Sequence, residues 1–322
     1  MPIEVLLAAG LTPLDINNIF VNDSDPAHFI RTAEKTGFPL NTCAWIKGIY
    51  GVCVEQGINK VICVTTGDCS NTSMLMEVLK LAGVDTIPFA YPNISDSTAM
   101  QQSLVAFAKT LGTTMDDAEA IRNLLLPCRQ ALRKLDELTW KENRISGKAN
   151  HYWLVSSSDF NQNHSEFHNS ILEAISASKN HSYPQNELRL AFIGVPPVFG
   201  KELYDFLEQN GARVVFNEIQ RQFSMPFSCD SLAQQYSQYT YPYDVGARIA
   251  DIGNEISVRK IDGIIHYVQA FCHRAIADIV FRHHLPIPIL TIEGNTDFKL
   301  SQHMKTRLEA FIDMLSHRSV TQ

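Results

Sequence analysis

The sequence predicts an α/β protein with parallel sheets, divided into two domains. Its 322 residues exceed the size of about 250 to 300 residues at which a single hydrophobic core stops growing. Short apolar, β-branched runs alternate along the chain with segments of helical periodicity, which is typical of strand–helix–strand units. Because the strand runs are almost continuously apolar, we expect helices to cover both faces of each sheet.

The clearest unit of this kind lies in the N-terminal half, within residues 60–92. An apolar run is followed there by a helical segment with Ala82-Gly83 as its stop signal, and then by a second apolar run. We expect a strand, a helix and a strand over residues 61–65, 72–81 and 85–90. The next stretch, residues 98–144, has helical periodicity and few strand formers, which predicts a helical connector.

The C-terminal half repeats the scheme with more strands. We expect strands over residues 188–195, 213–218, 262–268 and 287–292. We expect helices over residues 201–209, 243–259, 274–283 and 302–315. A stretch rich in Ser, Asn and His precedes the first of these strands and predicts a linker. The expected domains are therefore residues 1–155 and 187–322, joined by a linker over residues 156–186.

Composition and charge exclude several classes of protein. With 45% hydrophobic and 19% charged residues, the chain has an ordinary globular composition. Its formal net charge is −7 and it has no basic block, so we expect neither nucleic acid nor an anionic membrane as a partner. No apolar run approaches the ~20 residues that a membrane helix needs. The first residues do not have the pattern of a signal peptide, so we expect a cytoplasmic protein.

Seven cysteines are the feature of the composition that needs an explanation. They form no Cys-x-x-Cys pair, and they lie at positions 43, 53, 63, 69, 128, 229 and 272. Because cytosolic thiols stay reduced, core packing or metal binding must account for them. Cys63 lies inside a predicted strand and Cys128 inside the helical connector, which favours a core role for both. Cys53 and Cys229 stay undecided.

Three of the cysteines lie next to the ends of predicted elements. Cys69 and Cys272 each follow a strand and precede a helix, at the edge where open α/β sheets bind ligands. Cys43 follows Asn41-Thr42, which are good N-cap residues, and begins a helical stretch. A helix N-terminus favours the thiolate, which is the form that binds iron or zinc. Three such thiolates in one cleft could hold a [4Fe-4S] cluster and leave one iron open to substrate.

Zinc, bound by the same cysteines and by His266 or His273, is the competing metal site. Structural zinc sites usually draw ligands from closely spaced pairs, whereas 25 residues separate Cys43 from Cys69. Zinc is therefore disfavoured. An ordinary place in the core is the other alternative for each thiol, and position alone leaves the core and the ligand interpretations evenly balanced.

Five segments of the chain match, in order, the pattern of one family. They are Pro2-Ile-Glu-Val-Leu-Leu-Ala-Ala-Gly10, Cys43-Ala-Trp-Ile-Lys47, Thr65-Thr-Gly-Asp-Cys69, Ile261-Asp-Gly-Ile-Ile-His-Tyr-Val-Gln-Ala-Phe-Cys272-His273, and Pro288-Ile-Leu-Thr-Ile-Glu293 with Thr306-Arg307-Leu-Glu-Ala-Phe311. In these segments the chain resembles the D-component proteins of 2-hydroxyacyl-CoA dehydratases. That family is related to class I benzoyl-CoA reductase subunits and to double-cubane cluster proteins. The resemblance extends over almost the whole chain.

The resemblance implies an oxygen-sensitive protein with one [4Fe-4S] cluster per chain, bound by Cys43, Cys69 and Cys272. It implies two flavodoxin-like (Rossmann-like) domains and a helical part, in a homodimer or in a heterodimer with a family paralogue. A separate ATP-dependent iron–sulfur activator would supply a low-potential electron. With that electron the protein would dehydrate a 2-hydroxyacyl-CoA through a ketyl radical or reduce another small substrate. It would thus be an enzyme, a lyase or a reductase component.

Two departures from the family pattern bear on this expectation. The chain starts close to Pro2, whereas family enzymes carry a further N-terminal segment. This motivates the alternative of a non-catalytic [4Fe-4S] electron-relay subunit, or of a partner subunit in a heterodimer. The family often has Cys-x-Gly-x-Arg after the strand over residues 213–218, and here Arg221 is retained but the cysteine is not. A double-cubane [8Fe-9S] cluster is therefore disfavoured, although Cys53 or Cys229 could contribute thiolates.

A third departure concerns the last strand. The family commonly has Glu-x-Asp after it, and Glu293-Gly-Asn295 lacks the second carboxylate. A carboxylate beside a helix start and an arginine on a surface helix have ordinary structural uses, so we expect structural roles for Glu293 and Arg307.

Overall fold

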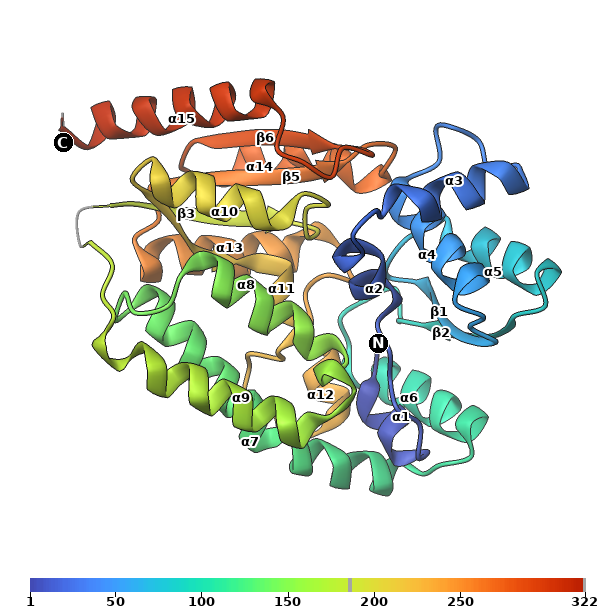
Figure 1. Cartoon of the computed structure of the whole chain (residues 1–322). Helices are drawn as coiled ribbons and strands as arrows, with labels where there is room; N and C mark the ends of the chain where they lie inside the picture. Colours follow the sequence, from blue (N-terminus) through green and yellow to red (C-terminus); the bar gives the residue numbers. More distant parts are fainter. Residues whose placement is uncertain (185–186, 321–322) are drawn as a thin grey trace. The chain divides into compact units, whose positions relative to one another are not determined.

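The computed structural model describes residues 1–184 and 187–320 and contains two parallel sheets surrounded by helices (Figure 1). One sheet pairs β1 with β2, and the other has the strand order β4-β3-β5-β6. The predicted α/β class with parallel sheets is therefore confirmed. Two flavodoxin-like domains stay a prediction, because a sheet of two strands does not by itself define such a domain.

The chain forms two compact units that are discontinuous in sequence. Unit 1 comprises Met1–Pro127, Ser158–His164 and Phe227–Asp244. Unit 2 comprises Cys128–Ser157, Ser165–Pro226 and Val245–Gln322. The expected division at residues 155 and 187 stays a prediction.

Unit 1 is built around the two-stranded sheet. Strands β1 (Lys60–Thr66) and β2 (Asp85–Ala90) are joined by α5 (Thr72–Leu81), within one residue of the expected bounds. Helix α4 (Ala44–Glu55) packs against α5 and α3 (Ala27–Thr36). The remaining helices of this unit are α1 (Ile3–Ala8), α2 (Ile16–Asn22), α6 (Ser97–Leu111), η2 (Phe160–Gln162) and α12 (Leu232–Ser237).

Two helices form the predicted helical connector. The first, α6, ends at Gly112, whose φ of +73° lies in the left-handed region that favours glycine. The second, α7 (Met115–Trp140), contains Pro127 at the boundary between the two units.

The stretch expected as a linker also contains helices. These are η1 (Ser156–Ser158), η2, α9 (His164–Ala177) and η3 (Ser178–Asn180). In α9 the apolar side chains of Phe167 and Ile171 are four residues apart and both buried, which is the spacing of one helix face. The abundant polar residues of this stretch hide that spacing in the sequence.

Unit 2 contains the four-stranded sheet and the helices that cover it. Its strands are β3 (Leu188–Gly194), β4 (Ala212–Asn217), β5 (Gly263–Gln269) and β6 (Ile289–Gly294), each within two residues of its expected bounds. Its main helices are α8 (Gly147–Val155), α10 (Gly200–Gln209), α11 (Glu218–Phe223), α13 (Val245–Arg259), η4 (His273–Ile276), α14 (Ala277–His284) and α15 (Gln302–Val320).

The strand order of this sheet marks its ligand-binding edge. β3 pairs with β4 on one side and with β5 on the other, so successive connections run in opposite directions from β3. In open parallel sheets, ligands bind beyond the carboxyl ends of the strands at such a reversal. Ile252 and Phe281 pack with the sheet residues Ala191 and Ile264 in one apolar cluster.

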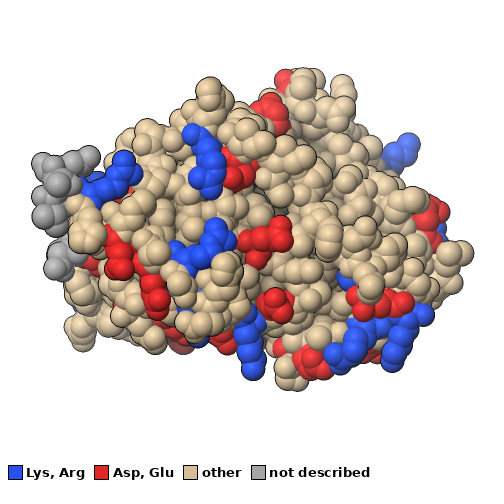
Figure 2. All heavy atoms as spheres, turned by 90° about the horizontal axis from the view of Figure 1, so that it is seen from above, with Lys and Arg blue, Asp and Glu red and all other residues tan. Residues whose placement is uncertain are grey.

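No helix in the described part of the chain has the length and apolar character needed to cross a membrane. On the face that Figure 2 shows, acidic and basic side chains are interspersed.

Candidate functional site

Cys69 lies in the turn between β1 and α5, at the carboxyl end of β1. Gly67 in this turn has a φ of +94°, and a Cβ added there would lie 2.8 Å from the Cβ atoms of Tyr91 and Pro242. Only glycine suits both the backbone angle and the space. The carbonyl of Cys69 accepts a hydrogen bond of 3.0 Å from the N–H of Thr72, at the start of α5. The turn therefore holds a half-buried thiol beside a helix N-terminus, as the sequence predicts.

Cys43 is the N-cap residue of α4 and is buried. The helix was expected to start at Ala44, which is confirmed, but the cap is Cys43 itself rather than Asn41 or Thr42. Lys47, one turn into the helix, is almost fully buried, and its Nζ donates to Glu34 Oε1 at 2.7 Å and to the carbonyl of Leu40 at 3.2 Å. Lys47 thus ties the segment before Cys43 to the helix that follows it.

Four cysteines meet in one apolar cluster of unit 1. Cys43, Cys53 and Cys63 are buried members, and Cys69 packs against the cluster. Burial raises the pKa of Cys53 to about 12 and that of Cys63 to about 11, so both keep their protons at neutral pH. The core role predicted for Cys63 is confirmed, and Cys53 shares it. Two of the three candidate ligands therefore lie in the same neighbourhood.

The other two cysteines outside the candidate set are separate from this cluster. Cys128 on α7 is buried, and burial raises the pKa of its thiol to about 12, which confirms its core role. The Cys229 thiol is half-buried and donates a hydrogen bond to Gln238 Oε1, with Sγ and Oε1 3.2 Å apart. The thiol of Cys229 therefore has Gln238 as its hydrogen-bond partner, outside the cysteine cluster.

Cys272 follows β5 in unit 2 and caps the short helix η4. The preceding residue, Phe271, has a φ of +64° and a side chain that is 54% exposed, so a bulky residue adopts a strained backbone conformation directly before the thiol. The N–H of Cys272 donates to the carbonyl of Gln269 at 3.1 Å, and its own carbonyl accepts from Ala275. The sequence predicted an α-helix here, but η4 precedes α14, which begins only at Ala277.

The three candidate ligands have the side-chain chemistry and the local positions that an iron–sulfur cluster needs. That they come together around one cluster stays a prediction. Each is a cysteine next to the start of a helix. Cys43 and Cys69 belong to unit 1 and Cys272 belongs to unit 2. Among the residues that the structure describes, no three His, Cys, Asp or Glu side chains are grouped so as to hold a metal ion.

His266, the histidine considered as a zinc ligand, has another partner. It is buried in β5, and its Nδ1 lies 2.6 Å from Asp278 Oδ1. Thr291 Oγ1 donates to the same carboxylate oxygen at 2.6 Å, and Arg282 Nε donates to Asp278 Oδ2 at 2.7 Å. These bonds orient the imidazole of His266 within the sheet.

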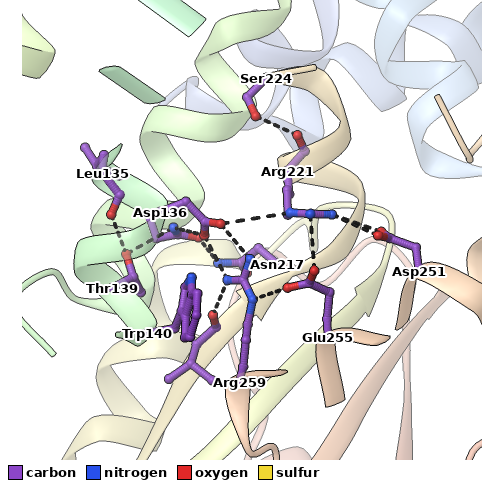
Figure 3. Close-up of polar contacts among 12 residues, drawn as sticks. Leu135, Asp136, Thr139, Trp140, Asn217, Arg221, Ser224, Asp251, Glu255 and Arg259 are labelled. Carbon is purple, nitrogen blue, oxygen red and sulfur yellow. Dashed lines mark hydrogen bonds and ion pairs between the residues drawn. The ribbon is translucent and has the colours of Figure 1, made fainter. Parts of the chain in front are cut away.

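Unit 2 contains a buried network of arginines and carboxylates that the sequence does not predict (Figure 3). The Nη1 and Nη2 atoms of Arg259 donate to the two oxygens of Asp136 at 2.9 and 2.6 Å, and its Nε donates to Glu255. Arg221 donates to both oxygens of Asp251, at 3.1 and 3.0 Å, and to Glu255 Oε1 at 3.2 Å. Only the Glu255–Arg259 pair, four residues apart in α13, is visible in the sequence as a helical spacing.

A second buried pair lies at the carboxyl end of β4. Arg248 donates to the two oxygens of Glu218 at 2.6 and 2.8 Å, and Glu218 also accepts from the N–H of Gly194 at 3.0 Å. Arg307 Nη2 donates to the carbonyl of Thr291 at 2.9 Å, which is a structural role of the kind expected, and the side chain of Glu293 is exposed.

The sequence profile of a family described as 2-hydroxyglutaryl-CoA dehydratase, D-component, matches residues 1–315 of the chain. No curated protein matches the chain.

Proposed function

The chain belongs to the family of 2-hydroxyglutaryl-CoA dehydratase D-components, and from this premise we propose that it is the iron–sulfur component of a 2-hydroxyacyl-CoA dehydratase or of a related reductase. The extent of the match, residues 1–315, carries the proposal. The family is known for iron–sulfur clusters. The positions of Cys69 and Cys272 after parallel strands support it, because ligands bind at that edge of such sheets.

In this proposal Cys43, Cys69 and Cys272 hold one [4Fe-4S] cluster per chain. When bound, the cluster supplies a single low-potential electron to a substrate. The N-terminus of α4, which is twelve residues long, favours the thiolate of Cys43. Gly67 shapes the turn that presents Cys69, and the strained residue Phe271 sets the direction of the chain at Cys272. Cys53, Cys63 and Cys128 are buried core residues, and we propose no ligand role for them.

The proposal includes the partners and setting that the family implies. An ATP-dependent iron–sulfur activator protein delivers the electron, and the chain acts in a dimer with a second copy or with a related subunit. The substrate is a small molecule such as an acyl-CoA, and the reaction takes place in the cytoplasm. We also propose a flavodoxin-like arrangement for unit 2, because its sheet is parallel and reverses its connections at β3.

One observation favours the alternative of an electron-relay or partner subunit. Where the family often has Cys-x-Gly-x-Arg after this strand, the chain has Asn217 at the cysteine position and Arg221 at the arginine position, and Arg221 is used in buried ion pairs of unit 2. With a relative exposure of 9%, Arg221 is poorly placed to meet a substrate. In the relay alternative the chain carries the cluster and a related subunit binds the substrate.

Anaerobic turnover distinguishes the two functions. The purified protein is incubated with an activator of the family, ATP, a low-potential reductant and 2-hydroxyglutaryl-CoA, and loss of water from the thioester is followed by mass spectrometry. The dehydratase proposal predicts turnover by the chain alone with its activator. Turnover that appears only after a related subunit is added supports the partner alternative, and a protein without iron after strictly anaerobic purification contradicts both.

A further inference from the structure

A row of hydrogen-bonded side chains in unit 2 runs from Asp136 to His151. Asn150 Nδ2 donates to Asp136 Oδ1 at 2.9 Å, and Asn217 Nδ2 donates to Asn150 Oδ1 at 2.8 Å. Tyr204 Oη donates to Asn217 Oδ1 at 2.6 Å and lies 3.0 Å from His151 Nδ1. The row links α7, α8, β4 and α10, and its first four members are buried. Figure 3 shows the Asp136 end of the row with Asn217.

The direction of every bond in this row follows from Asp136. Burial acts to raise the pKa of this carboxyl group, but Arg259 lowers it below its ordinary value, so Asp136 is ionised and can only accept. Asn150 must therefore turn its amide nitrogen toward Asp136 and its oxygen toward Asn217. For the same reason Asn217 presents its oxygen to Tyr204. Tyr204 then donates its single hydroxyl proton to the Asn217 side-chain oxygen.

These hydrogen-bond directions determine which ring nitrogen of His151 carries the proton. Because the hydroxyl proton of Tyr204 points to Asn217, the Tyr204 oxygen can only accept, and His151 must donate to it from Nδ1. The side-chain amide of Gln220 must then present its oxygen to His151. Its nitrogen is placed 3.1 Å from Nδ1, where it would donate, so the Nδ1–H tautomer requires the amide turned over, with the oxygen accepting from Nδ1–H.

A neutral imidazole with its proton on Nδ1 carries a lone pair on Nε2. Burial lowers the pKa of His151 to about 4, which keeps the ring neutral at pH 7. The side chain is half-buried, and within the described residues Nε2 has no hydrogen bond. A Cβ added to Gly200 would lie 3.9 Å from Nε2, so this atom lies beside the start of α10, just beyond the carboxyl end of β3.

We propose that His151 Nε2 accepts a hydrogen bond from a small ligand bound at the carboxyl edge of the four-stranded sheet. This step rests on the proposed function, under which the donor is the 2-hydroxyl group of a 2-hydroxyacyl-CoA. Tyr204 is a positioning residue, because it holds the imidazole in the tautomer that leaves Nε2 without a proton. A site built to bind a hydroxyl group discriminates against an analogue that lacks it.

Nitrogen NMR of the protein labelled with ¹⁵N-histidine tests the tautomer. We expect the His151 proton on Nδ1 in the anaerobically purified protein, with His266 as an internal reference because its Nδ1 faces a carboxylate. Tyr204→Phe should move a measurable fraction of His151 to the Nε2–H form. Tyr152→Phe, at an exposed position on the same helix, should leave the tautomer unchanged. A proton on Nε2 in the wild-type protein overturns the assignment.

Binding of two matched thioesters tests the ligand. Calorimetry should show that 2-hydroxyglutaryl-CoA binds the wild-type protein about tenfold more tightly than glutaryl-CoA, the effect of one hydrogen bond. His151→Phe should remove this difference while the affinity for glutaryl-CoA is unchanged, and Tyr204→Phe should reduce it. Equal affinities in the wild-type protein overturn the role of His151 but leave the proposed function standing. If neither thioester binds, the proposed substrate class is wrong, and the ligand assigned to His151 is wrong with it.

Discussion

Unit 1 and unit 2 share a plan of parallel strands joined by helices, but their interiors hold different chemistry. The core of unit 1 contains three buried thiols, with a fourth packed against them. The core of unit 2 contains the network of Arg221, Arg259 and their carboxylates, together with the Arg248–Glu218 pair. Ion pairs also occur in unit 1, where Arg31–Asp25 and Lys80–Glu77 join exposed side chains and the buried Lys47 pairs with Glu34.

Because of this difference, we expect different perturbations to destabilise the two units. A buried charge that loses its partner is strongly destabilising, because its desolvation is no longer offset. Unit 2 should therefore be sensitive to the loss of single charges. The thiols of Cys53 and Cys63 keep their protons and pack as small apolar groups, so unit 1 should be sensitive to backbone changes in its turns and to alkaline pH.

The largest effect is expected from Arg259→Met in unit 2. This change removes the nearest cation of Asp136 and of Glu255, leaves Arg221 to pair with both, and removes a donor to the carbonyl of Val215. We expect a loss of about 3 to 5 kcal/mol in the free energy of unfolding, measured by urea titration of the whole chain. The matched change Arg31→Met, in an exposed pair of unit 1, should leave the free energy of unfolding nearly unchanged. Equal losses in the two variants would remove the distinction between the units.

The next effect is expected from Gly67→Ala in unit 1. The added methyl group would meet Tyr91 and Pro242 in a turn whose backbone angle is unfavourable for alanine. We expect a loss of about 2 to 4 kcal/mol by urea titration. Gly83→Ala is the control, since Gly83 also has a positive φ but open space around it, and it should cost only about 1 kcal/mol. Similar losses would show that the crowding around Gly67 is unimportant.

Alkaline pH should weaken unit 1 through Cys53 and Cys63. Their pKa values, about 12 and about 11 in the folded chain, exceed the ordinary value of about 8.5, so above that value the unfolded chain releases protons that the folded chain keeps. The stability from these neutral thiols is complete below pH ~8.5 and is lost as the pH rises toward 11. The expected slope is below about 1.4 kcal/mol per pH unit for each thiol, because solvent screening reduces it.

Unfolding by urea at pH 8, 9 and 10 measures this slope. In a Cys53→Ala, Cys63→Ala double variant the stability at pH 8 is lower, but its decline with pH should be shallower. An unchanged slope would mean that other groups cause the alkaline loss.

The smallest effect is expected from Phe271 in unit 2. Phe271→Gly and Phe271→Ala both remove the exposed ring, but only glycine accepts the φ of +64° without strain. The glycine variant should therefore be more stable than the alanine variant by about 1 kcal/mol in urea titration. If the alanine variant is equally stable, the backbone before Cys272 is not strained.

The sequence predicted the strands and the helices that follow them well, because their signals are local. Alternation of apolar runs with helical periods located all six strands of the described residues, and turn residues such as Ala82-Gly83 located helix ends. The α9 helix was missed because its buried residues, Phe167 and Ile171, are few among polar neighbours. At Cys43 the sequence predicted the helix start but not the residue that caps it.

The site was predictable only in part, because its contacts join distant residues. Asp136 and Arg259 are 123 positions apart, and Tyr204 and His151 are 53 apart, so no spacing in the sequence indicates either contact. Arg221 was recognised through the family pattern, but its ion pairs with Asp251 and Glu255 required the fold. The positions of Cys69 and Cys272 could be predicted, since both depend only on a strand and the turn that follows it.

The most direct test of the cluster assignment is the iron and sulfide content of two variants after strictly anaerobic purification. Cys272→Ala removes a candidate ligand, whereas Cys128→Ala removes a buried thiol of the same unit whose pKa is raised to about 12. We predict about four irons and four sulfides per chain in the wild-type and Cys128→Ala proteins, as expected for one [4Fe-4S] cluster, and a marked loss in Cys272→Ala. Unchanged iron in Cys272→Ala, with a folded protein, would contradict the account.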